Sequence, residues 1–319
     1  MASGKDLSKC FTGTHEVQEC LEGQGEVDLH THLANCKKNP GHKNFVPVNQ
    51  LSLEHFLGYR DNDVYDLTKV LADQTVRIAV KLTSPDRPEF VPGTKEPYPC
   101  YNTRGQNSLR TGTGKVERVT KYTEGMDGYR TCPCPECDHS DTPSNVWWEV
   151  SVWTSTHVVF DDSEARQSSC RLWFDDDKSP VVKIYGWEVG ESDTEEDVCS
   201  LYCVTHDVDV GGKLEEMEWR FYGLCKKVED KYKSRRDVVK LTIIVSHPHG
   251  CSKQVSVGHW VDRQAGRDMT RYTYTTATCP GSSGAMVYRL GWGWGSDHPH
   301  SGANSGGLNY SGVWWELDL

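Results

Sequence analysis

Most hydrophobic residues of the chain fall into short runs that are rich in valine, isoleucine and aromatic residues, and turn-forming residues separate these runs. Runs of this kind, bounded by Gly, Pro, Asn and Asp, are typical of β-strands. They predict strands over residues 76–82, 116–122, 147–154, 170–174, 181–189, 198–204, 238–246, 254–261 and 270–276. Many short strands at this spacing indicate an all-β protein built as a sandwich or as barrels.

A helical period occurs in two parts of the chain. In the longer one, apolar residues recur every three or four positions, namely Leu214, Met217, Phe221, Leu224 and Val228. This stripe predicts an amphipathic helix near 213–235, inserted between two β-rich halves. Two shorter helical patterns follow Ser52 and Asp63, each a suitable N-cap. We therefore expect a partly helical N-terminal extension over 1–72, of unknown role, and a β domain over 73–319.

Composition argues against several classes of partner. The 319 residues carry a formal net charge of −11 with a pI near 5.6, whereas a nucleic-acid surface is normally basic. No run approaches the roughly 20 apolar residues of a membrane span, and the polar start Met-Ala-Ser-Gly-Lys-Asp does not resemble a signal peptide. The 13 cysteines are an odd number in a long chain, which favours reduced thiols. We expect an intracellular protein, cytoplasmic or nuclear, that binds neither nucleic acid nor membranes.

The stretch Gly281-Ser282-Ser283-Gly284 raises the question of a reactive serine. Taken alone, it fits an ordinary turn before the apolar run that starts at Met286. A serine nucleophile also needs a turn that exposes its hydroxyl, backbone N–H groups for an oxyanion, and a histidine and a carboxylate from elsewhere in the chain. Glycine at 281 and 284 meets the first requirement, since a residue without Cβ can adopt positive φ.

Candidates for the histidine and the carboxylate lie upstream. His157 follows a predicted strand, and Asp207 precedes alternating apolar positions that can anchor it at a strand start. Each signal alone has a structural explanation, as a core histidine and as an exposed carboxylate. Asp209 shares a strand face with Asp207, so periodicity cannot choose between the two. The order His157, Asp207, Ser283 is nevertheless that of a chymotrypsin-type triad.

On these residues the chain resembles a trypsin-like serine peptidase. The stretches Thr154-Ser-Thr-His157, Asp207-Val-Asp-Val and Gly281-Ser-Ser-Gly284 are similar to the family's Thr-Ala-Ala-His, Asp-Ile-Ala-Leu and Gly-Asp-Ser-Gly elements. The region 244–258 resembles a strand pair of the non-secreted, HtrA-like branch. Ser282 replaces the aspartate that binds a newly cut N-terminus in secreted members, so activation by propeptide cleavage is not expected. The resemblance covers about residues 73–319.

The resemblance implies two six-stranded antiparallel β-barrels with the triad between them. His157 would take the proton of Ser283 during attack and return it to the leaving amine, while Asp207 would orient the imidazole. The N–H groups of Gly281 and Ser283 would form the oxyanion hole. Ser283 rather than Ser282 would be the nucleophile, because only Ser283 has the family's spacing to both glycines. The implied function is that of a serine endopeptidase acting on proteins or peptides through an acyl-enzyme, without a cofactor.

A specificity pocket follows from the same resemblance. Its floor would be Ala277 with Thr278 beside it, and the opposite wall would be His300, Ser301 and Gly302. No aspartate is present there to attract Lys or Arg. A threonine hydroxyl and an imidazole that converge would select Glu or Gln before the scissile bond, because an apolar side chain would leave both unpaired. If His300 points away, the small floor would instead admit Phe, Leu or Met.

Cysteine and histidine residues also occur at spacings that suit a zinc site. One such set is Cys132, Cys134, Cys137 and His139, although a proline-rich thiol loop explains it as well. A looser set with the same alternative is His30, His32, Cys36 and His42, and we interpret His247 and His249 as structural.

Two other functions stay open from the sequence. A trypsin-like fold that is catalytically silent can act as a protein-interaction module, although such modules usually lack a triad residue and all three are present here. The chain could also be a zinc-stabilised binding protein in which the Ser-Gly turn is incidental. Labelling with a fluorophosphonate probe tests the first alternative, and metal analysis tests the second.

Overall fold

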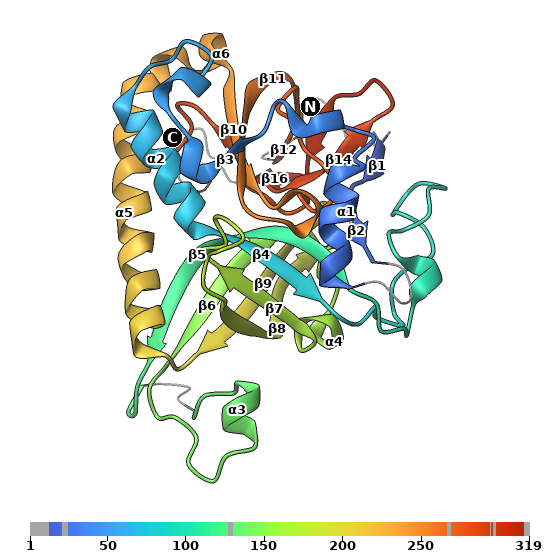
Figure 1. The fold of residues 1–319 in the computed structure, drawn as a ribbon, viewed down its shortest axis with the longest axis vertical. Coiled ribbons are helices and arrows are strands. Elements are labelled where there is room, and N and C mark those ends of the chain that lie inside the picture. The colour runs from blue at the N-terminus through green and yellow to red at the C-terminus, as the bar shows by residue number, and fades with distance from the viewer. Residues whose placement is uncertain are drawn as a thin grey trace, which may run out of the picture.

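The computed structural model describes residues 13–20, 25–126, 130–266, 269–293, 295 and 298–315. Two antiparallel β-sheets lie one above the other, and two longer helices lie along one side of them (Figure 1). The predicted all-β class is confirmed, and the long runs of the sequence form the strands that the alternation of apolar residues indicates.

The lower sheet in Figure 1 is a closed barrel of six strands. Its members are β4 (Thr75–Val80), β5 (Arg110–Tyr122), β6 (Trp147–Thr154), β7 (Ser168–Leu172), β8 (Val182–Asp193) and β9 (Val198–Thr205). They pair in the order β5-β4-β7-β8-β9-β6, and pairing of β6 with β5 closes the ring. Side chains such as Ile78, Val152 and Leu201 fill its interior and are fully buried. Each comes from the inward face of an alternating strand.

Six further strands form the second barrel. They are β10 (Leu241–Ser246), β11 (Gln254–Gly266), β12 (Met269–Tyr274), β13 (Val287–Arg289), β14 (His300–Asn304) and β15 (Asn309–Ser311). Their order is β14-β15-β12-β11-β10-β13. The two ends meet where Val287 N–H donates to His298 O (2.9 Å) and His300 N–H donates to Ala285 O (2.7 Å). The short strands β3 (Val46–Pro47) and β16 (Trp314–Trp315) extend this sheet.

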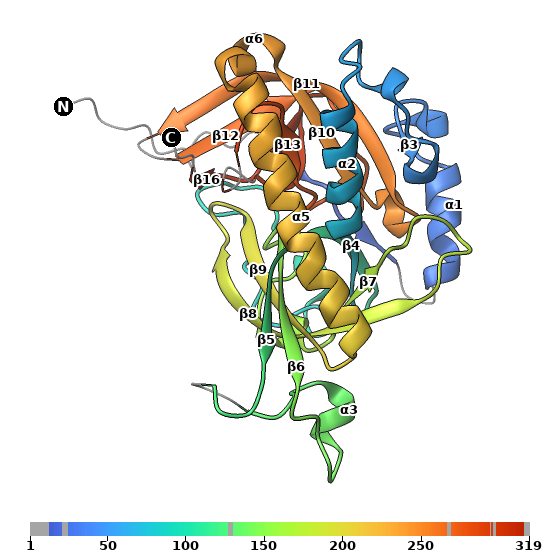
Figure 2. The same cartoon turned by 90° about the vertical axis from the view of Figure 1, so that its left-hand side faces the viewer.

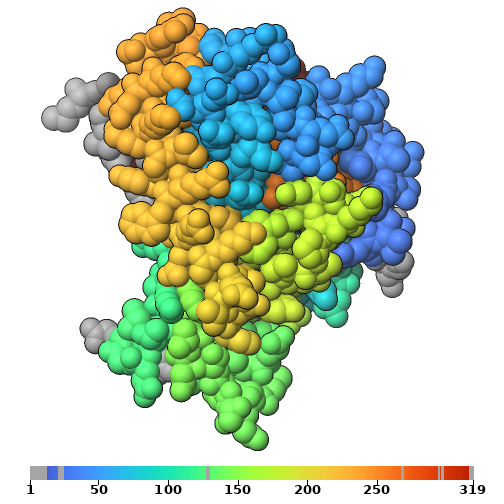
Figure 3. All heavy atoms as spheres, turned by 60° about the vertical axis from the view of Figure 1, so that its left-hand side comes forward, coloured from blue at the N-terminus to red at the C-terminus, as the bar shows by residue number. Residues whose placement is uncertain are grey.

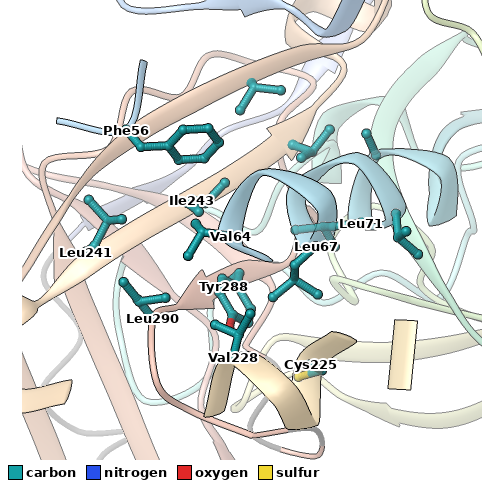
Figure 4. Packing of buried hydrophobic residues seen from close by; sticks show 14 of the residues in the cluster. Phe56, Val64, Leu67, Leu71, Cys225, Val228, Leu241, Ile243, Tyr288 and Leu290 are labelled. Atoms are coloured by element: carbon teal, nitrogen blue, oxygen red, sulfur yellow. The ribbon is translucent and has the colours of Figure 1, made fainter. Parts of the chain in front are cut away.

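Helix α5 (Val208–Tyr232) is the predicted amphipathic helix, and it begins five residues earlier than the apolar stripe suggested. Helix α2 (Asn62–Gln74) packs beside it, and α5 runs along one face past both barrels (Figures 2 and 3). Apolar side chains of both helices, including Leu67 and Val228, meet Ile243 and Tyr288 of the second barrel (Figure 4). Among the described residues, no helix has the length and apolar character needed to cross a membrane.

Shorter helical segments connect these elements. The α-helical ones are α1 (Leu29–Ala34), α3 (Pro135–Asp138), α4 (Asp162–Ala165) and α6 (Arg236–Val239). The 3-10 turns are η2 (Glu26–Asp28), η3 (Pro40–His42), η4 (Val48–Gln50), η5 (Leu53–His55), η6 (Tyr101–Thr103), η7 (Lys233–Arg235) and η8 (Pro248–Gly250). Two sequence expectations change here. The pattern after Ser52 gives only the turn η5, and α6 takes the start of the strand predicted at 238, which begins at Leu241 instead.

The N-terminal segment contributes one strand to each barrel. Strand β1 (Gly13–His15) pairs with β14 of the second barrel. Strand β2 (Gln18–Glu19) pairs with β5 of the first barrel. Residues Glu16 and Val17 therefore lie where the chain crosses from one barrel to the other.

Candidate active site

The turn around Ser283 depends on its two glycines. Gly281 and Gly284 have φ values of 93° and 83°, a region that residues with a Cβ rarely adopt. A Cβ on Gly284 would also lie 2.0 Å from Thr154 Oγ1. The turn lies against β5, where Thr113 N–H donates to Ser283 O (2.8 Å). Ser283 is thereby held at the junction of the barrels.

Ser282 has a role within the turn itself. Its Oγ lies 3.0 Å from Ser246 Oγ and accepts a hydrogen bond from Cys279 N–H at 3.2 Å. The side chain is fully buried. The neighbouring Ser283 hydroxyl instead donates to the carbonyl oxygen of Glu16, in the N-terminal segment. Of the two adjacent serines, Ser283 is therefore the one whose hydroxyl meets a peptide carbonyl.

The partner of His157 is Asp197. Nδ1 of His157 lies 2.8 and 2.9 Å from the two carboxylate oxygens of Asp197, and both residues are buried. Nε2 of His157 is buried and has no hydrogen-bond partner among the described residues. Asp197 immediately precedes β9 and adopts φ 56°, a left-handed conformation that aspartate tolerates better than most residues. Ser301 also donates a hydrogen bond to Asp197.

The expectation that Asp207 pairs with His157 is therefore corrected. Asp207 is exposed at the start of α5, where its carboxylate accepts hydrogen bonds from the N–H groups of Asp209 and Val210, both at 3.0 Å. It is a helix N-cap, and the alternation of apolar residues after it belongs to a helix rather than a strand. Asp197 carried a usable signal, since it also lies between His157 and Ser283 and directly precedes a predicted strand.

Asp197 is ionised in this environment. Burial by itself would raise the pKa of Asp197, but the charges of His157 and His15 and hydrogen bonds from His157 and Ser301 lower it well below its usual range. A buried carboxylate beside Nδ1 favours the imidazole tautomer that carries its proton on Nδ1. The opposite nitrogen, Nε2, is then able to accept a proton.

A buried arginine holds the backbone of His157. The guanidinium of Arg87 donates to His157 O at 3.1 and 3.2 Å and to the carboxylate of Glu164 at 2.7 and 2.8 Å. Arg110 shares the same carboxylate at 2.6 Å. Three buried ionic groups thus position the loop that follows β6. The sequence pattern gave no sign of this cluster.

Strand β1 and Glu16 lie beside these residues, at the junction of the barrels. Thr14 and His15 oppose Ala303 and Gly302 in the antiparallel pairing of β1 with β14, and Glu16 N–H donates to Ser301 O at 3.2 Å. A Cβ on Gly302 would lie 2.1 Å from Thr14 O, so glycine is needed for this close approach. The ring of His15 lies 4.7 Å from that of His157, measured between centroids.

The side chain of Glu16 enters the predicted specificity pocket. Its Oε2 lies 2.8 Å from both Thr278 Oγ1 and His300 Nε2. The ammonium group of Lys38 donates to Oε1. His300 is oriented on its other side by the hydroxyl of Tyr274, 2.7 Å from Nδ1. The pocket therefore presents three polar groups to one carboxylate.

Glu16 is ionised in the pocket. Burial by itself would raise the pKa of Glu16, but the hydrogen bond and charge of His300 and the charge of Lys38 lower it to about 2. Lys38 is further held by Thr278 Oγ1 at 3.0 Å and by Asn309 Oδ1 at 2.7 Å. Sequence reasoning missed Lys38, because it lies 240 residues from Thr278 and belongs to no local motif.

Ala277 and Gly281 are the remaining residues that were predicted for the pocket floor and the oxyanion hole. Ala277 packs in an apolar cluster with Cys36, Phe45 and Cys279 and is 9% exposed. The carbonyl of Gly281 accepts a hydrogen bond from Thr113 Oγ1 at 2.7 Å. The role of the Gly281 and Ser283 N–H groups as an oxyanion hole stays a prediction.

The structure brings Cys132, Cys134 and Cys137 together with His206, rather than with His139. Nδ1 of His206 lies 3.8, 3.3 and 3.6 Å from the three sulfur atoms in that order. His139 is the residue that ends helix α3. His206 rather than His139 completes the cluster because His206 directly follows β9, which brings it to this loop from a distant part of the chain.

The second predicted set, His30, His32, Cys36 and His42, does not form one cluster. Cys36 and His42 join His249 and Cys279 in a second compact group. His30 and His32 are not part of that group, and His30 instead lies 3.9 Å from the sulfur of Cys251. Both His247 and His249 were interpreted as structural. His247 has Nδ1 2.9 Å from Cys251 O and its ring stacked on Phe174, whereas His249 lies in the second compact group.

Comparisons with known proteins gave structural likenesses only. No family model and no curated protein matches the chain. The HtrA-type protease AlgW with decapeptide has a TM-score of 0.42 and 13% identity, over 77% of this chain and 62% of that chain. The Rv3671c protease in its inactive form has a TM-score of 0.37 and 12% identity, over 79% and 90% of the two chains. Its active form, from M. tuberculosis, has a TM-score of 0.39 and 13% identity, over 79% and 82%.

Proposed function

We propose that the chain is a serine endopeptidase that hydrolyses peptide bonds after glutamate, with Ser283 as nucleophile, His157 as general base and Asp197 as its carboxylate partner. One observation carries this proposal. The main-chain carbonyl of Glu16 accepts a hydrogen bond from the Ser283 hydroxyl while its carboxylate occupies the pocket between Thr278 and His300. These contacts are the ones that this proposal assigns to the residue before a scissile bond.

In the proposed reaction, Ser283 Oγ attacks the carbonyl carbon and its proton passes to His157 Nε2. The same imidazole then protonates the leaving amine, and a water molecule hydrolyses the acyl-enzyme. Asp197 keeps the imidazole in the required tautomer and stabilises the imidazolium. In the structure the Ser283 hydroxyl donates to the Glu16 carbonyl rather than to His157. Such hydrogen bonds commonly tighten only in the reacting complex.

The pocket favours glutamate for a physical reason. Thr278, His300 and Lys38 are arranged around its carboxylate. An apolar side chain would leave the buried Nε2 of His300 unpaired, at a cost of about 1–3 kcal/mol, and would remove the carboxylate that neutralises Lys38. The alternative of an apolar pocket required His300 to point away, whereas its Nε2 faces the Glu16 carboxylate. The charge of Lys38 distinguishes Glu from Gln, since a neutral amide gains less from a nearby ammonium group.

A peptide library with a variable residue before the cleaved bond tests this function. We expect cleavage after Glu, loss of turnover and of fluorophosphonate labelling in Ser283→Ala, and at least a tenfold smaller preference for Glu over Gln in Lys38→Gln. The matched control is Lys37→Gln, which removes the adjacent exposed lysine and should change nothing. Cleavage after Phe or Leu alone would overturn the specificity. A folded chain with no labelling at Ser283 would favour the interaction module instead.

A further inference from the structure

The N-terminal segment has the backbone register of a bound substrate. Residues 13–16 pair antiparallel with β14 on one side of Ser283, and residues 18–19 pair with β5 on the other side. The crossing point is the Glu16–Val17 peptide bond, and the Glu16 carbonyl is the group that meets Ser283. Strand addition at both ends holds this bond across the cleft, because main-chain hydrogen bonds fix its position whatever the side chains.

We propose that the Glu16–Val17 bond is a self-cleavage site, cut by Ser283 of the same chain. This proposal rests on the proposed function and adds the first substrate of the enzyme. Glu16 carries the side chain that fits the pocket, whereas Glu19, the nearest other glutamate on the far side, bonds to the Thr103 hydroxyl at 2.9 Å. The segment therefore offers one bond in the reactive position.

The chemistry balances with water as the only co-reactant. Ser283 Oγ forms an ester bond with the Glu16 carbonyl carbon, and its proton moves to His157 Nε2. The Glu16–Val17 C–N bond breaks, and the proton goes from His157 to the new amine of Val17. Water then cleaves the ester, which gives the carboxylate of Glu16 and restores the Ser283 hydroxyl.

The two halves of the cut segment are held differently. On the Val17 side, Gln18 and Glu19 stay paired with β5, and the Gln18 side-chain oxygen lies 2.8 Å from His249 Nδ1. On the other side, residues up to Glu16 are held by β1 pairing and by the pocket. Because the fragment that ends at Glu16 no longer has a covalent link, it can leave and open the cleft for other substrates. This differs from the activation that the sequence argued against, since it needs no aspartate at position 282 to bind the new N-terminus. Lys38 stays with the body of the protein and keeps the pocket complete.

Intact mass spectrometry of the purified full chain tests the proposal. We expect wild-type protein to lose residues 1–16 and to begin at Val17, while Ser283→Ala and Glu16→Ala stay whole. Glu19→Ala is the matched control in the same segment and should be cut like the wild type. Cleavage within one chain predicts a first-order rate that does not change over a hundredfold dilution.

The outcomes separate this proposal from the proposed function. Glu16→Ala empties the pocket but leaves β1 and β2 paired. It should therefore cleave a glutamyl peptide added in solution at a measurable rate that is lower than that of the processed wild type. If it does so while the wild-type chain stays whole or is cut elsewhere, self-cleavage is wrong and the peptidase assignment stands. If neither wild type nor Glu16→Ala cleaves any peptide, both are wrong. A rate that rises in proportion to protein concentration would show cutting between molecules and would overturn the intramolecular proposal.

A second inference comes from an independent feature, the group Cys36, His42, His249 and Cys279. Their nearest ligand atoms all lie within 4.8 Å of one another. The sulfur atoms are 3.5 Å apart, and His42 Nε2 is 3.4 Å from the sulfur of Cys279. A tetrahedral zinc ion with ordinary bond lengths requires separations of roughly 3.3–3.8 Å. Nε2 of His249 is buried and has no hydrogen-bond partner among the described residues.

We infer that these four side chains form a Cys2His2 zinc site, and that the separate cluster of Cys132, Cys134, Cys137 and His206 forms a second, Cys3His zinc site. The outer contacts fit a metal-bound state. The side-chain amide of Asn39 donates to the sulfur of Cys279 at 3.1 Å. The backbone N–H of Asn39 donates to the sulfur of Cys36 at 3.4 Å. Nδ1 of His249 faces the Gln18 oxygen, an arrangement common for zinc-bound histidine.

The position of this site would let a bound zinc ion connect two parts of the proposed active site. Cys279 lies in the segment that leads to Ser283, next to Thr278 of the pocket. Cys36 and His42 lie on either side of Lys38 in the sequence, after helix α1. A metal ion that joins them would hold the Lys38 ammonium group at the pocket and the nucleophile turn in place.

Metal content measured on purified full-length protein tests both sites. We expect two zinc ions per wild-type chain and one in either Cys36→Ser or Cys132→Ser, with Cys100→Ser, outside both groups, keeping two. Titration of the demetallated wild type with Co²⁺ should give thiolate charge-transfer bands at two equivalents, so the test does not depend on folding of a variant. A wild-type content of one ion that is lost in Cys132→Ser would overturn the Cys36 site. A content of zero would overturn both.

Discussion

At the scale of single residues, two aspartates near the ends of β9 have different roles because their carboxylates meet different groups. Asp197 is buried and accepts from the imidazole of His157 and the hydroxyl of Ser301. Asp207 is exposed and accepts from two backbone N–H groups at the start of α5. The first arrangement can stabilise a developing imidazolium, whereas the second stabilises a helix end.

Substitution of each aspartate should therefore affect a different property. We expect Asp197→Asn to lower kcat by about 10⁴-fold, because an amide cannot hold the imidazole tautomer that accepts the Ser283 proton. Asp207→Ala should leave kcat unchanged and lower the free energy of unfolding by about 0.5–2 kcal/mol, through loss of the N-cap. Turnover of a glutamyl peptide and urea unfolding measure the two effects. A folded Asp207→Ala chain without activity would contradict this division.

At the scale of elements, the N-terminal strand is held by one ionised side chain as well as by backbone pairing. Glu16 faces His300 of β14 and Lys38, which follows α1, and its pKa is lowered to about 2 from a usual value of 4.5. Because the pKa is lower in the folded state, this carboxylate stabilises the fold above about pH 4.5. The contribution is lost as the pH falls from 4.5 toward 2.

Acid stability should report this contribution directly. In a Ser283→Ala background, which keeps the chain whole, Glu16→Gln should lower stability at pH 6 by up to about 3 kcal/mol, an upper estimate from the size of the pKa shift. The difference between the two proteins should shrink as the pH falls through 4.5 toward 2. Urea unfolding at a series of pH values measures it. A difference that stays constant with pH would show that the Glu16 carboxylate contributes no charge effect.

At the scale of the whole molecule, the site is assembled from parts that no single barrel contains. His157 and Asp197 belong to the first barrel, while Ser283 and the pocket wall at His300 belong to the second. The N-terminal segment then adds Glu16 and Lys38 across the junction. Helices α2 and α5 pack together against the second barrel, and α5 also contacts β5 and β6 of the first, so the barrels share one covering layer.

Local pattern alone determined most of the longer strands and the long helix, but it did not predict β13, β14 and β15, which lie after the last predicted run. Strand runs such as 147–154 were predictable because alternation of buried and exposed positions is written into neighbouring residues. His157 and Ser283 were selected from short motifs and their order, whereas Thr278 and His300 followed only from the resemblance to trypsin-like peptidases. The start of α5 was not predicted correctly, because an aspartate before an apolar residue suits both a strand start and a helix N-cap. The residues after Asp207 also fit either a helical or a strand period.

Only the tertiary structure decided which distant side chains meet. Asp197, His206 and Lys38 are separated by long stretches of chain from the residues they contact. No local motif marks His206 or Lys38 as a partner, and the position of Asp197 before a strand did not distinguish it from Asp207. The same holds for the Glu16 carbonyl at Ser283, which depends on β1 and β2 pairing with different barrels. Local sequence specifies the conformation of short segments through steric and hydrogen-bonding preferences. Contacts between such segments depend on how the barrels pack, because the burial that selects them exists only in the folded chain.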